Sequence, residues 1–373
     1  MINKERLLSE FFELVQIDSE TGFERKIAED LKKKFEQLGL VVYEDDTTSR
    51  TGHEAGNLIG LLKGNIDGGE TILLNCHMDT VSPGQGVKPS VKDGYVVSDG
   101  TTILGADDKA GIAALLESLR ILKEKNIPHG DVQIVITVGE EADLVGAKAL
   151  DPKILTADYG YAIDTGGNVG NIKSSAPARG MISVDVYGKT AHAGVAPEKG
   201  VSAITIAAKA IANMPLGRID SETTANIGAF EGQSPLNVVC DHVKVSGEAR
   251  SFDNKKLEEQ LALMKYEFER AAKEFGGEVE TTVEISFTGF KLTDGEPVVE
   301  VAKRAAKKIG RPCELFAAGG GSDANIFNGH GIPMVVLACG YEDIHTKNEK
   351  IAVEELNKLA EMVLAVIMEA AQK

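Results

Sequence analysis

Residues 71–79 read Thr-Ile-Leu-Leu-Asn-Cys-His-Met-Asp, an apolar run of strand length that ends in a histidine and an aspartate. Such a run, bounded by glycine and charge, is typical of a buried strand. Ligands of open α/β sheets collect at the carboxyl ends of the strands, so His77 and Asp79 stand where a site is expected. In an extended chain both side chains project to one side, and the carboxylate can orient the imidazole. Taken alone, a His-x-Asp pair is more typical of a surface histidine beside an acid.

Strands and helices alternate on both sides of this stretch. The alternation indicates an α/β fold, a doubly wound sheet with helices on its faces. Before residue 178 the expected elements are helices at 4–15 and 23–38, strands at 40–44, 58–62 and 71–75, a helix at 109–125, a strand at 132–138, a helix at 142–150 and a strand at 159–163. After residue 290 they are a helix at 297–309, strands at 313–317 and 334–338, and a helix at 353–371.

The order of elements changes after Pro177, where it becomes β-α-β-β-α-β, the ferredoxin-like unit. We therefore expect a discontinuous α/β domain, residues 1–178 and 291–373, into which a smaller α+β domain, residues 179–290, is inserted. The inserted elements are expected as strand 181–187, helix 201–214, strands 223–230 and 239–251, helix 254–275 and strand 278–287.

The composition excludes several classes of protein. Of the 373 residues, 43% are hydrophobic and 26% are charged, which is ordinary for a soluble globular chain of more than one domain. The net charge of −17 argues against a nucleic-acid partner, because such binding relies on clustered Lys and Arg. A charged start and the lack of a long apolar run predict no signal segment and no membrane span. Four scattered cysteines fit a reducing compartment, so we expect a cytoplasmic protein.

Pairs of acidic residues stand beside other predicted elements. Asp107 and Asp108 lie in a turn before an apolar helix, where they could serve as an N-cap and a first-turn carboxylate. A carboxylate can also bridge two cations, which one imidazole nitrogen cannot do. Glu140 and Glu141 follow the strand at 132–138. They are either two solvated glutamates or a metal ligand beside a general base, since neighbouring side chains diverge.

The joint pattern decides between these alternatives. Asp164 ends one predicted strand and His345 follows another, so His, Asp and Glu motifs come after several different strands of one sheet. If each motif had its own unrelated explanation, all of these explanations would have to hold at once, which is improbable. Two imidazoles with three carboxylates suit two zinc ions, although cobalt or manganese would also fit mixed nitrogen and oxygen ligands. The remaining histidines lack an acidic partner motif, and we expect no role for His53, His129, His242 and His330.

These motifs, with Leu-Val-Gln-Ile-Asp-Ser-Glu-Thr-Gly at 14–22, resemble the zinc metallopeptidase family of aminoacylase, glutamate carboxypeptidase and peptidase T, most closely its peptidase T branch. The resemblance spans nearly the whole chain. It implies that one carboxylate bridges two metals, each of which has one histidine and one further carboxylate. Those ligands are Asp107 as the bridge, His77 and Asp164 on one metal, and Glu141 and His345 on the other.

The same resemblance assigns roles around the metals. Glu140 becomes the general base, and Asp79 becomes the carboxylate behind His77. The peptide between Asp107 and Asp108 is expected to be cis.

The inserted domain resembles the lid and dimerisation domain of this family. Its Gly-x-x-Ala-His-Ala-Gly segment is present at 188–194, and the resemblance implies that His192 reaches the active site of a partner subunit in a homodimer. Arg250 resembles the residue that grips a substrate carboxylate, a task suited to a planar guanidinium. Asn237 matches a lid asparagine, although the following Val-Val-Cys departs from the family's proline-bearing sequence. Gly321 lies in a Gly-Gly-Gly-Ser-Asp run that resembles a substrate-backbone loop, but glycine runs also form simple turns.

The sequence thus predicts a di-zinc metallopeptidase that hydrolyses short peptides in the manner of a tripeptide aminopeptidase. A carboxypeptidase or an N-acyl amino acid deacylase would share the same metal centre, so both remain alternatives. A non-catalytic scaffold that binds peptide or metal is a third. A missing base or ligand would indicate such a scaffold, and none of those positions is vacant here.

Overall fold

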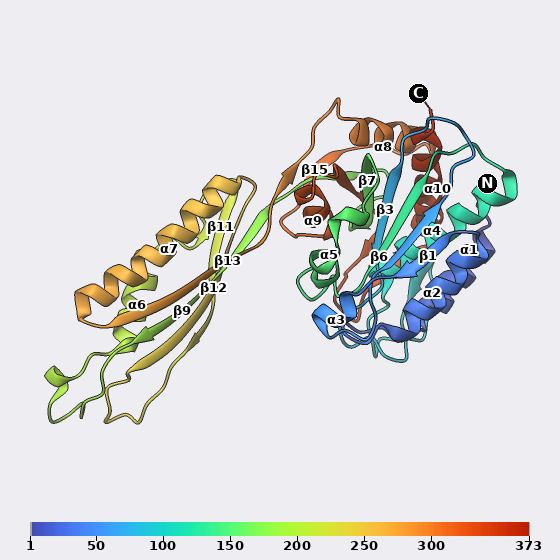
Figure 1. The fold of residues 1–373 in the computed structure, drawn as a ribbon. Helices are drawn as coiled ribbons and strands as arrows, with labels where there is room; N and C mark the ends of the chain where they lie inside the picture. Colours follow the sequence, from blue (N-terminus) through green and yellow to red (C-terminus); the bar gives the residue numbers. More distant parts are fainter. Residues whose placement is uncertain (1, 373) are drawn as a thin grey trace. The chain divides into compact units, whose positions relative to one another are not determined.

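The computed structural model describes residues 2–372, which form two compact units. The first unit comprises the chain up to Ser175, Leu292–Ala317, and the chain from Ser322 onward. The second comprises Ala176–Lys291 and Ala318–Gly321. In Figure 1 the first unit contains both the blue N-terminal segments and the dark red C-terminal helix.

The first unit is built on a mixed sheet whose central strands are parallel. β6, β3, β7 and β16 are neighbours in that order, so their carboxyl ends meet at one edge. Every residue of β3, β6 and β16 is buried, as expected of strands covered on both faces. The predicted α/β class is confirmed. The strands run in the order β1 (Val41–Glu44), β2 (Leu58–Leu62), β6 (Val132–Thr137), β3 (Ile72–His77), β7 (Tyr159–Thr165), β16 (Met334–Ala338) and β8 (Ile172–Ala176), with β15 (Leu315–Ala317) pairing with β8.

Amphipathic helices enclose this sheet. α1, for example, begins at Lys4 behind an Asn3 cap and buries Leu7, Phe11 and Leu14 at helical spacing. α4 packs against α1, α10 and β3 and is buried along most of its length, so it lies inside the unit rather than on its surface. The helices are α1 (Lys4–Val15), α2 (Arg25–Gln37), α3 (Thr47–Thr51), α4 (Ala106–Lys125), α5 (Val145–Ala149), α8 (Pro297–Lys308), α9 (Asp323–Gly329) and α10 (Val353–Ala370).

A small second sheet was not predicted. It contains β17 (Tyr341–Glu342), β18 (Lys350–Ala352), β5 (Tyr95–Val97) and β4 (Ser90–Lys92) in that order. Strands of two or three residues are too short to show an alternating pattern, so only long-range pairing reveals them. This sheet holds both ends of the loop that carries His345.

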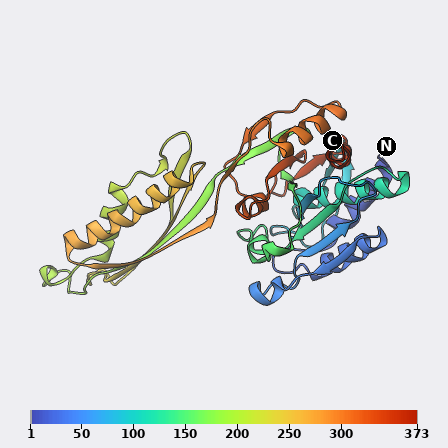
Figure 2. The ribbon, with the colours of Figure 1, turned by 45° about the horizontal axis from the view of Figure 1, so that its top comes forward.

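The second unit has the predicted β-α-β-β-α-β order with one addition, a two-residue strand between the first helix and the second predicted strand. Its antiparallel sheet runs β10, β11, β12, β9, β13, and α6 and α7 pack against each other and against this sheet (Figures 1 and 2). The longer helix is capped by Asp253 and is followed by Gly276, whose φ of 78° is left-handed. The elements are β9 (Ala178–Tyr187), α6 (Ala203–Asn213), β10 (Gly217–Arg218), β11 (Thr223–Glu231), β12 (His242–Ser251), α7 (Asn254–Phe275) and β13 (Glu278–Phe287).

The observed division differs from the expected one at the boundaries and in one short segment. Residues 176–178 and 291 belong to the second unit, and Ala318–Gly321, also expected in the first domain, packs with the second unit. The Gly319 carbonyl accepts a hydrogen bond from Arg250 Nη1 at 3.0 Å. A Cβ at Gly321 would lie 2.4 Å from the Phe287 ring, so only glycine fits there.

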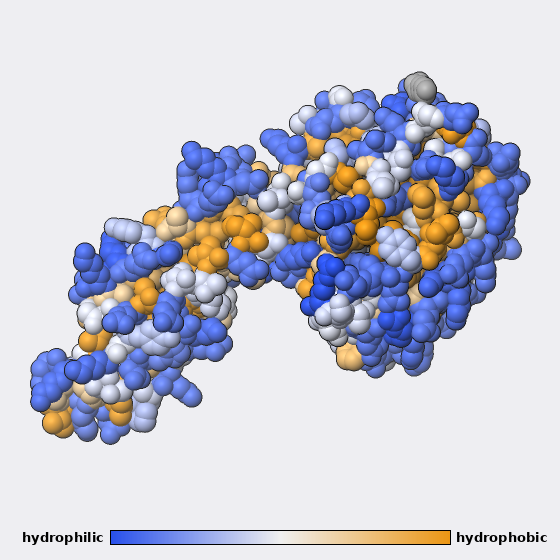
Figure 3. Space-filling view, viewed as in Figure 1, coloured by the Kyte–Doolittle hydropathy of each residue, from blue (hydrophilic) through white to orange (hydrophobic). Residues whose placement is uncertain are grey.

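The surface carries mixed polarity. On the face seen in Figure 3, hydrophilic residues are interspersed with apolar patches. Among the helices of residues 2–372, none is both long enough and apolar enough to span a bilayer.

Candidate metal centre

Five side chains from separate parts of the first unit converge at the carboxyl edge of its central sheet. His77 ends β3, Asp107 opens α4, Glu141 follows β6, Asp164 lies in β7, and His345 lies between β17 and β18. His77 Nε2 is 3.1 Å from Asp107 Oδ1 and 3.7 Å from Asp164 Oδ1. His345 Nε2 is 2.8 Å from Glu141 Oε1 and 3.4 Å from Asp107 Oδ2. The structure therefore brings together all five residues that the sequence singled out.

The five residues divide into two groups that share Asp107. Within the group of His77, Asp107 and Asp164, and within the group of Asp107, Glu141 and His345, the potential ligand atoms lie within 4.8 Å of one another. Asp107 turns one carboxylate oxygen toward each group. Two cations bridged by one carboxylate fit this arrangement, and the nitrogen and oxygen donors are those of zinc and similar divalent ions.

The buried carboxylates of the centre favour the binding of positive ions. Burial, followed by repulsion from neighbouring carboxylates, raises the pKa of Asp164 well above its usual range. Burial also raises the pKa of Asp107, but hydrogen bonds from His345 and His77 outweigh it and lower the net pKa. Hydrogen bonds to Asp107 and Glu141 raise the pKa of His345 to about 10. Buried carboxylates need compensation of this kind, and a pair of divalent cations would supply it.

Asp107 and Asp108 are not the helix caps that one alternative suggested. The cap position is Gly105, which has no side chain of its own to cap the helix. Both aspartates have non-helical backbone angles, and the peptide between them is cis, as the resemblance implied. Asp108 is buried and its Oδ2 accepts the His77 backbone N–H at 3.3 Å.

Asp79 makes more contacts than the expected one to His77. Its Oδ1 is 3.3 Å from His77 Nδ1, which lies closer still, 3.0 Å, to the Asp79 carbonyl oxygen. The same carboxylate accepts the backbone N–H groups of Glu140 at 3.0 Å and Glu141 at 3.3 Å. Thr21 donates to it at 2.8 Å. One buried carboxylate thus holds both an imidazole and the turn that carries the two glutamates.

Glu140 belongs to neither of the two groups that share Asp107. One of its oxygens and one of Glu141 lie within 4.8 Å of a His77 ring nitrogen. Burial, followed by the nearby Asp164, raises the pKa of Glu140 well above its usual range. A carboxylate with a raised pKa is a stronger proton acceptor, which suits a general base.

The remaining predicted site residues lie in the second unit. Arg250 Nε donates to Glu248 Oε1 at 3.0 Å, and Arg179 Nε donates to Glu248 Oε2 at 2.7 Å. His192 and Asn237 are both exposed and lie on neighbouring loops, since the Ala193 N–H donates to the Asn237 carbonyl at 2.9 Å.

Comparison with known proteins identifies the family. Residues 73–369 match the model of Peptidase family M20/M25/M40. The chain belongs to this family. It is accordingly a metal-dependent peptidase, and the predicted family relationship is confirmed.

Relatives in the M20/M25/M40 family cover the whole chain. The crystal structure of aminopeptidase PepT from Bacillus cereus superposes with a TM-score of 0.96 at 63% identity and covers 100% of both chains. A tripeptidase from Staphylococcus aureus gives 0.96 at 51% identity, also over 100% of both chains. Peptidase T of Escherichia coli (strain SE11) is 26% identical over 99% of both sequences.

The contacts of Asp79 lead to a first prediction for this peptidase. Replacing Asp79 with asparagine removes the charge and puts an amide NH₂ where one of the two oxygens accepts a backbone N–H, so the anchor of His77 and the Glu140 turn is weakened. Activity should fall about 10- to 100-fold, the usual cost of losing a partner of a metal-binding residue. The measurements are kcat/KM on a tripeptide and zinc affinity.

The matched control for this prediction is Asp45→Asn. Asp45 also accepts several bonds, from the backbone of Thr47 and from the backbone and side chain of Asn57, but it does not touch the metal centre. Equal losses of activity in the two variants would show that only the fold was damaged.

Several residues beside the centre escaped the sequence analysis. His53, for which no role was expected, has an acidic partner, because its Nδ1 lies 2.9 Å from Glu24 Oε1. Its ring also packs against Gly139, where a Cβ would lie 2.5 Å from His53 Cε1, so it supports the turn before Glu140. Asp323 is buried and accepts bonds from Asn75 in β3 and from Thr137 at the end of β6. No local signal reveals such pairs, because the partners are far apart in the chain.

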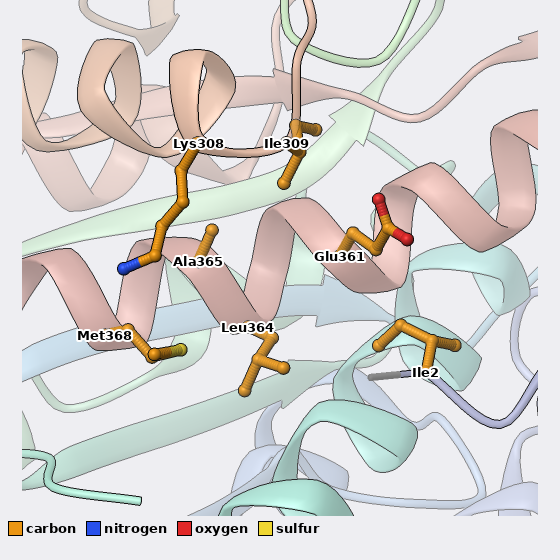
Figure 4. Close-up of a pocket in the computed structure, with 7 residues that line it drawn as sticks. All are labelled: Ile2, Lys308, Ile309, Glu361, Leu364, Ala365 and Met368. Atoms are coloured by element: carbon orange, nitrogen blue, oxygen red, sulfur yellow. The ribbon is translucent and has the colours of Figure 1, made fainter.

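A separate cavity lies away from the centre. It has a volume of about 150 Å³, and Figure 4 shows its mainly apolar side chains, which come from Ile2, the end of α8 and α10. None of the five converging residues lines it. The lining residues are Ile2, Lys308, Ile309, Glu361, Leu364, Ala365 and Met368.

Proposed function

We propose that the chain is an aminopeptidase for short peptides, tripeptides in particular, and that it works with two zinc ions held by His77, Asp107, Glu141, Asp164 and His345. The observation that carries this proposal is the shared Asp107 carboxylate, whose two oxygens each face a separate imidazole and carboxylate pair. The names of the relatives from Bacillus cereus and Staphylococcus aureus support the substrate class.

The chemistry follows from the residues around the centre. When bound, two divalent ions lower the pKa of a water molecule and polarise the scissile carbonyl. Glu140 accepts the proton of the attacking water and returns it to the departing amine, for which its raised pKa suits it. Asp79 keeps the Glu140 turn and His77 in register during these transfers. In the homodimer proposed below, His192 of the partner subunit is proposed to stabilise the developing oxyanion.

The direct test is a panel of substrates on protein of known metal content. We expect release of the N-terminal residue from tripeptides, with weaker cleavage of dipeptides and N-acyl amino acids. Release of the C-terminal residue would instead indicate a carboxypeptidase, and preference for N-acyl amino acids a deacylase. No hydrolysis of any member by metal-loaded protein would indicate a scaffold.

Zinc is proposed as the native metal, and cobalt or manganese would fit the same mixed ligands. Elemental analysis of protein purified without added metal tests this directly. We expect about two zinc ions per chain if every proposed ligand binds. Protein that is fully active without any bound metal would contradict the proposal.

Arg250 is proposed to grip the C-terminal carboxylate of the peptide, with Asn237 and the Gly321 loop as further substrate contacts. Replacing Arg250 with alanine should lower kcat/KM for a tripeptide about 10- to 100-fold, the worth of a charge-assisted hydrogen bond. The loss should be small for the corresponding tripeptide amide, which lacks the carboxylate. Kinetics on the two substrates measure the difference.

The control for Arg250 is Arg179→Ala. Arg179 shares Glu248 with Arg250, so its removal disturbs the same ion-pair network while the proposed grip stays in place. A variant at Arg250 that loses equal activity on the acid and the amide would exclude the carboxylate role.

A homodimer in the cytoplasm is also proposed. The second unit exposes large apolar residues on its strands, including Phe230, Val283 and Ile285. Such exposed groups are common in interfaces between subunits. Sedimentation of the purified chain tests the dimer, and a monomer at micromolar concentration would contradict it.

A further inference from the structure

Glu349 is a buried carboxylate close to the metal centre that the proposed mechanism does not use. It lies four residues after His345, immediately before β18, and is only 2% exposed. Its Oε2 accepts the backbone N–H groups of Leu104 at 2.8 Å and Gly105 at 2.7 Å. Its Oε1 accepts the backbone N–H of Asp107 at 3.0 Å.

These three bonds satisfy backbone N–H groups for which residues 2–372 provide no other side-chain acceptor. Gly105, the cap residue of α4, has a left-handed φ of 75°, and Asp107 has non-helical backbone angles. The first amides of a helix have no partner within it and carry partial positive charge. A carboxylate at this end is therefore favourable, and here it comes from a loop more than two hundred residues later in the chain.

The loop that carries Glu349 also carries His345, and the turn that it holds carries Asp107. His345 and Asp107 belong to the same group of potential ligands, with Nε2 and Oδ2 3.4 Å apart. We infer that Glu349 is a positioning residue of the metal centre, which joins the His345 loop to the Asp107 turn through three backbone hydrogen bonds and so determines the spacing of the second group. This inference rests on the ligands proposed above.

The alternative is that Glu349 only stabilises the fold, and Glu117 offers a matched comparison. Glu117 is a second buried glutamate whose carboxylate accepts a backbone N–H, from Asn3 at 3.0 Å, together with bonds from Arg6. It lies on α4, the helix that Asp107 opens, but it touches none of the proposed ligands. Glu117→Gln therefore removes a buried charge from the same helix without disturbing the metal centre.

The test measures metal affinity, by competition of zinc with a chromophoric chelator, in the parent chain, Glu349→Gln, Glu349→Asp and Glu117→Gln. We expect affinity for the second ion to fall about 10- to 100-fold in Glu349→Gln, the range found for partners of metal-binding residues. Glu349→Asp keeps the charge but withdraws the carboxylate by one methylene, so a loss there reports geometry rather than charge. Glu117→Gln should keep the parent affinity.

Two further readouts separate positioning from stability. In the cobalt-substituted protein, Glu349→Asp should alter the visible absorption of the metal, because the ligand geometry changes, whereas Glu117→Gln should not. Hydrogen exchange of the metal-free chain should show faster exchange at the amides of Leu104, Gly105 and Asp107 in the variants at Glu349.

The outcomes distinguish this inference from the proposed function. If the parent chain binds no metal, the proposed centre itself is wrong. If the parent binds two ions and Glu349→Asp binds them with the same affinity and spectrum, only the positioning role is overturned. If Glu349→Gln does not fold, the result for Glu349→Asp decides by itself. An equal loss of affinity in Glu117→Gln would also overturn it.

Discussion

Replacing Glu140 with glutamine should lower turnover about 10²- to 10⁴-fold while both metal ions stay bound. Glutamine has nearly the same shape but cannot accept a proton at neutral pH. The backbone N–H of Glu140 still reaches Asp79, so the turn keeps its position. The measurements are kcat on a tripeptide and metal content by elemental analysis.

The neighbouring Glu141→Gln is the control for this prediction. Glu141 Oε1 faces His345 Nε2 at 2.8 Å within the second group, so this variant should lose metal as well as activity. We therefore expect Glu140 to act as the base and Glu141 to act as a metal ligand. Unchanged turnover in Glu140→Gln would remove Glu140 from the mechanism.

Replacing Asp107 with alanine should have the second large effect. We expect most bound metal to be lost and activity to fall about 10³-fold or more, because bound metal ions contribute several kcal/mol of transition-state stabilisation. Asp107 is the one residue common to both groups, with an oxygen turned toward His77 and another toward His345. Its removal also leaves the other carboxylates of the centre to repel one another, because no shared cation is held between them. Metal titration and tripeptide kinetics measure the two effects.

Asp108→Asn provides the matched control for Asp107. Burial raises the pKa of Asp108 well above its usual range, so its carboxyl group is closer to neutral and an amide resembles it. We expect this variant to retain two ions. If Asp107→Ala kept both ions with parent affinity, the bridging assignment would fail.

Much of the metal centre was predictable because its parts lie at strand ends. His77, Glu141 and Asp164 each stand at or just past the end of a buried strand, and parallel neighbours bring those ends to one edge. The boundaries shifted slightly, since β3 runs on to His77 and β7 includes Asp164. Periodicity locates buried strands well but not their last residue, which depends on pairing.

Other contacts could not be predicted. The loop of His345 is held by a four-stranded sheet of two- and three-residue strands, which have no recognisable pattern. The triple contact of Glu349 joins residues far apart in the chain, and the pairing of His53 with Glu24 crosses between loops. Such partners are chosen by packing in three dimensions, so neither spacing nor propensity indicates them.

The amino-acid sequence by itself determined the α/β class, the ferredoxin-like order of the second unit and the identities of the converging His, Asp and Glu residues. These depend on local periodicity and on chemistry carried by single residues. Only the tertiary structure decided which oxygen of Asp107 faces which imidazole, that Asp79 holds the Glu140 turn, and that Glu349 joins two ligand-bearing segments. The physical reason is that hydrogen bonds form over about 3 Å between groups whose approach is fixed by the packing of the whole unit.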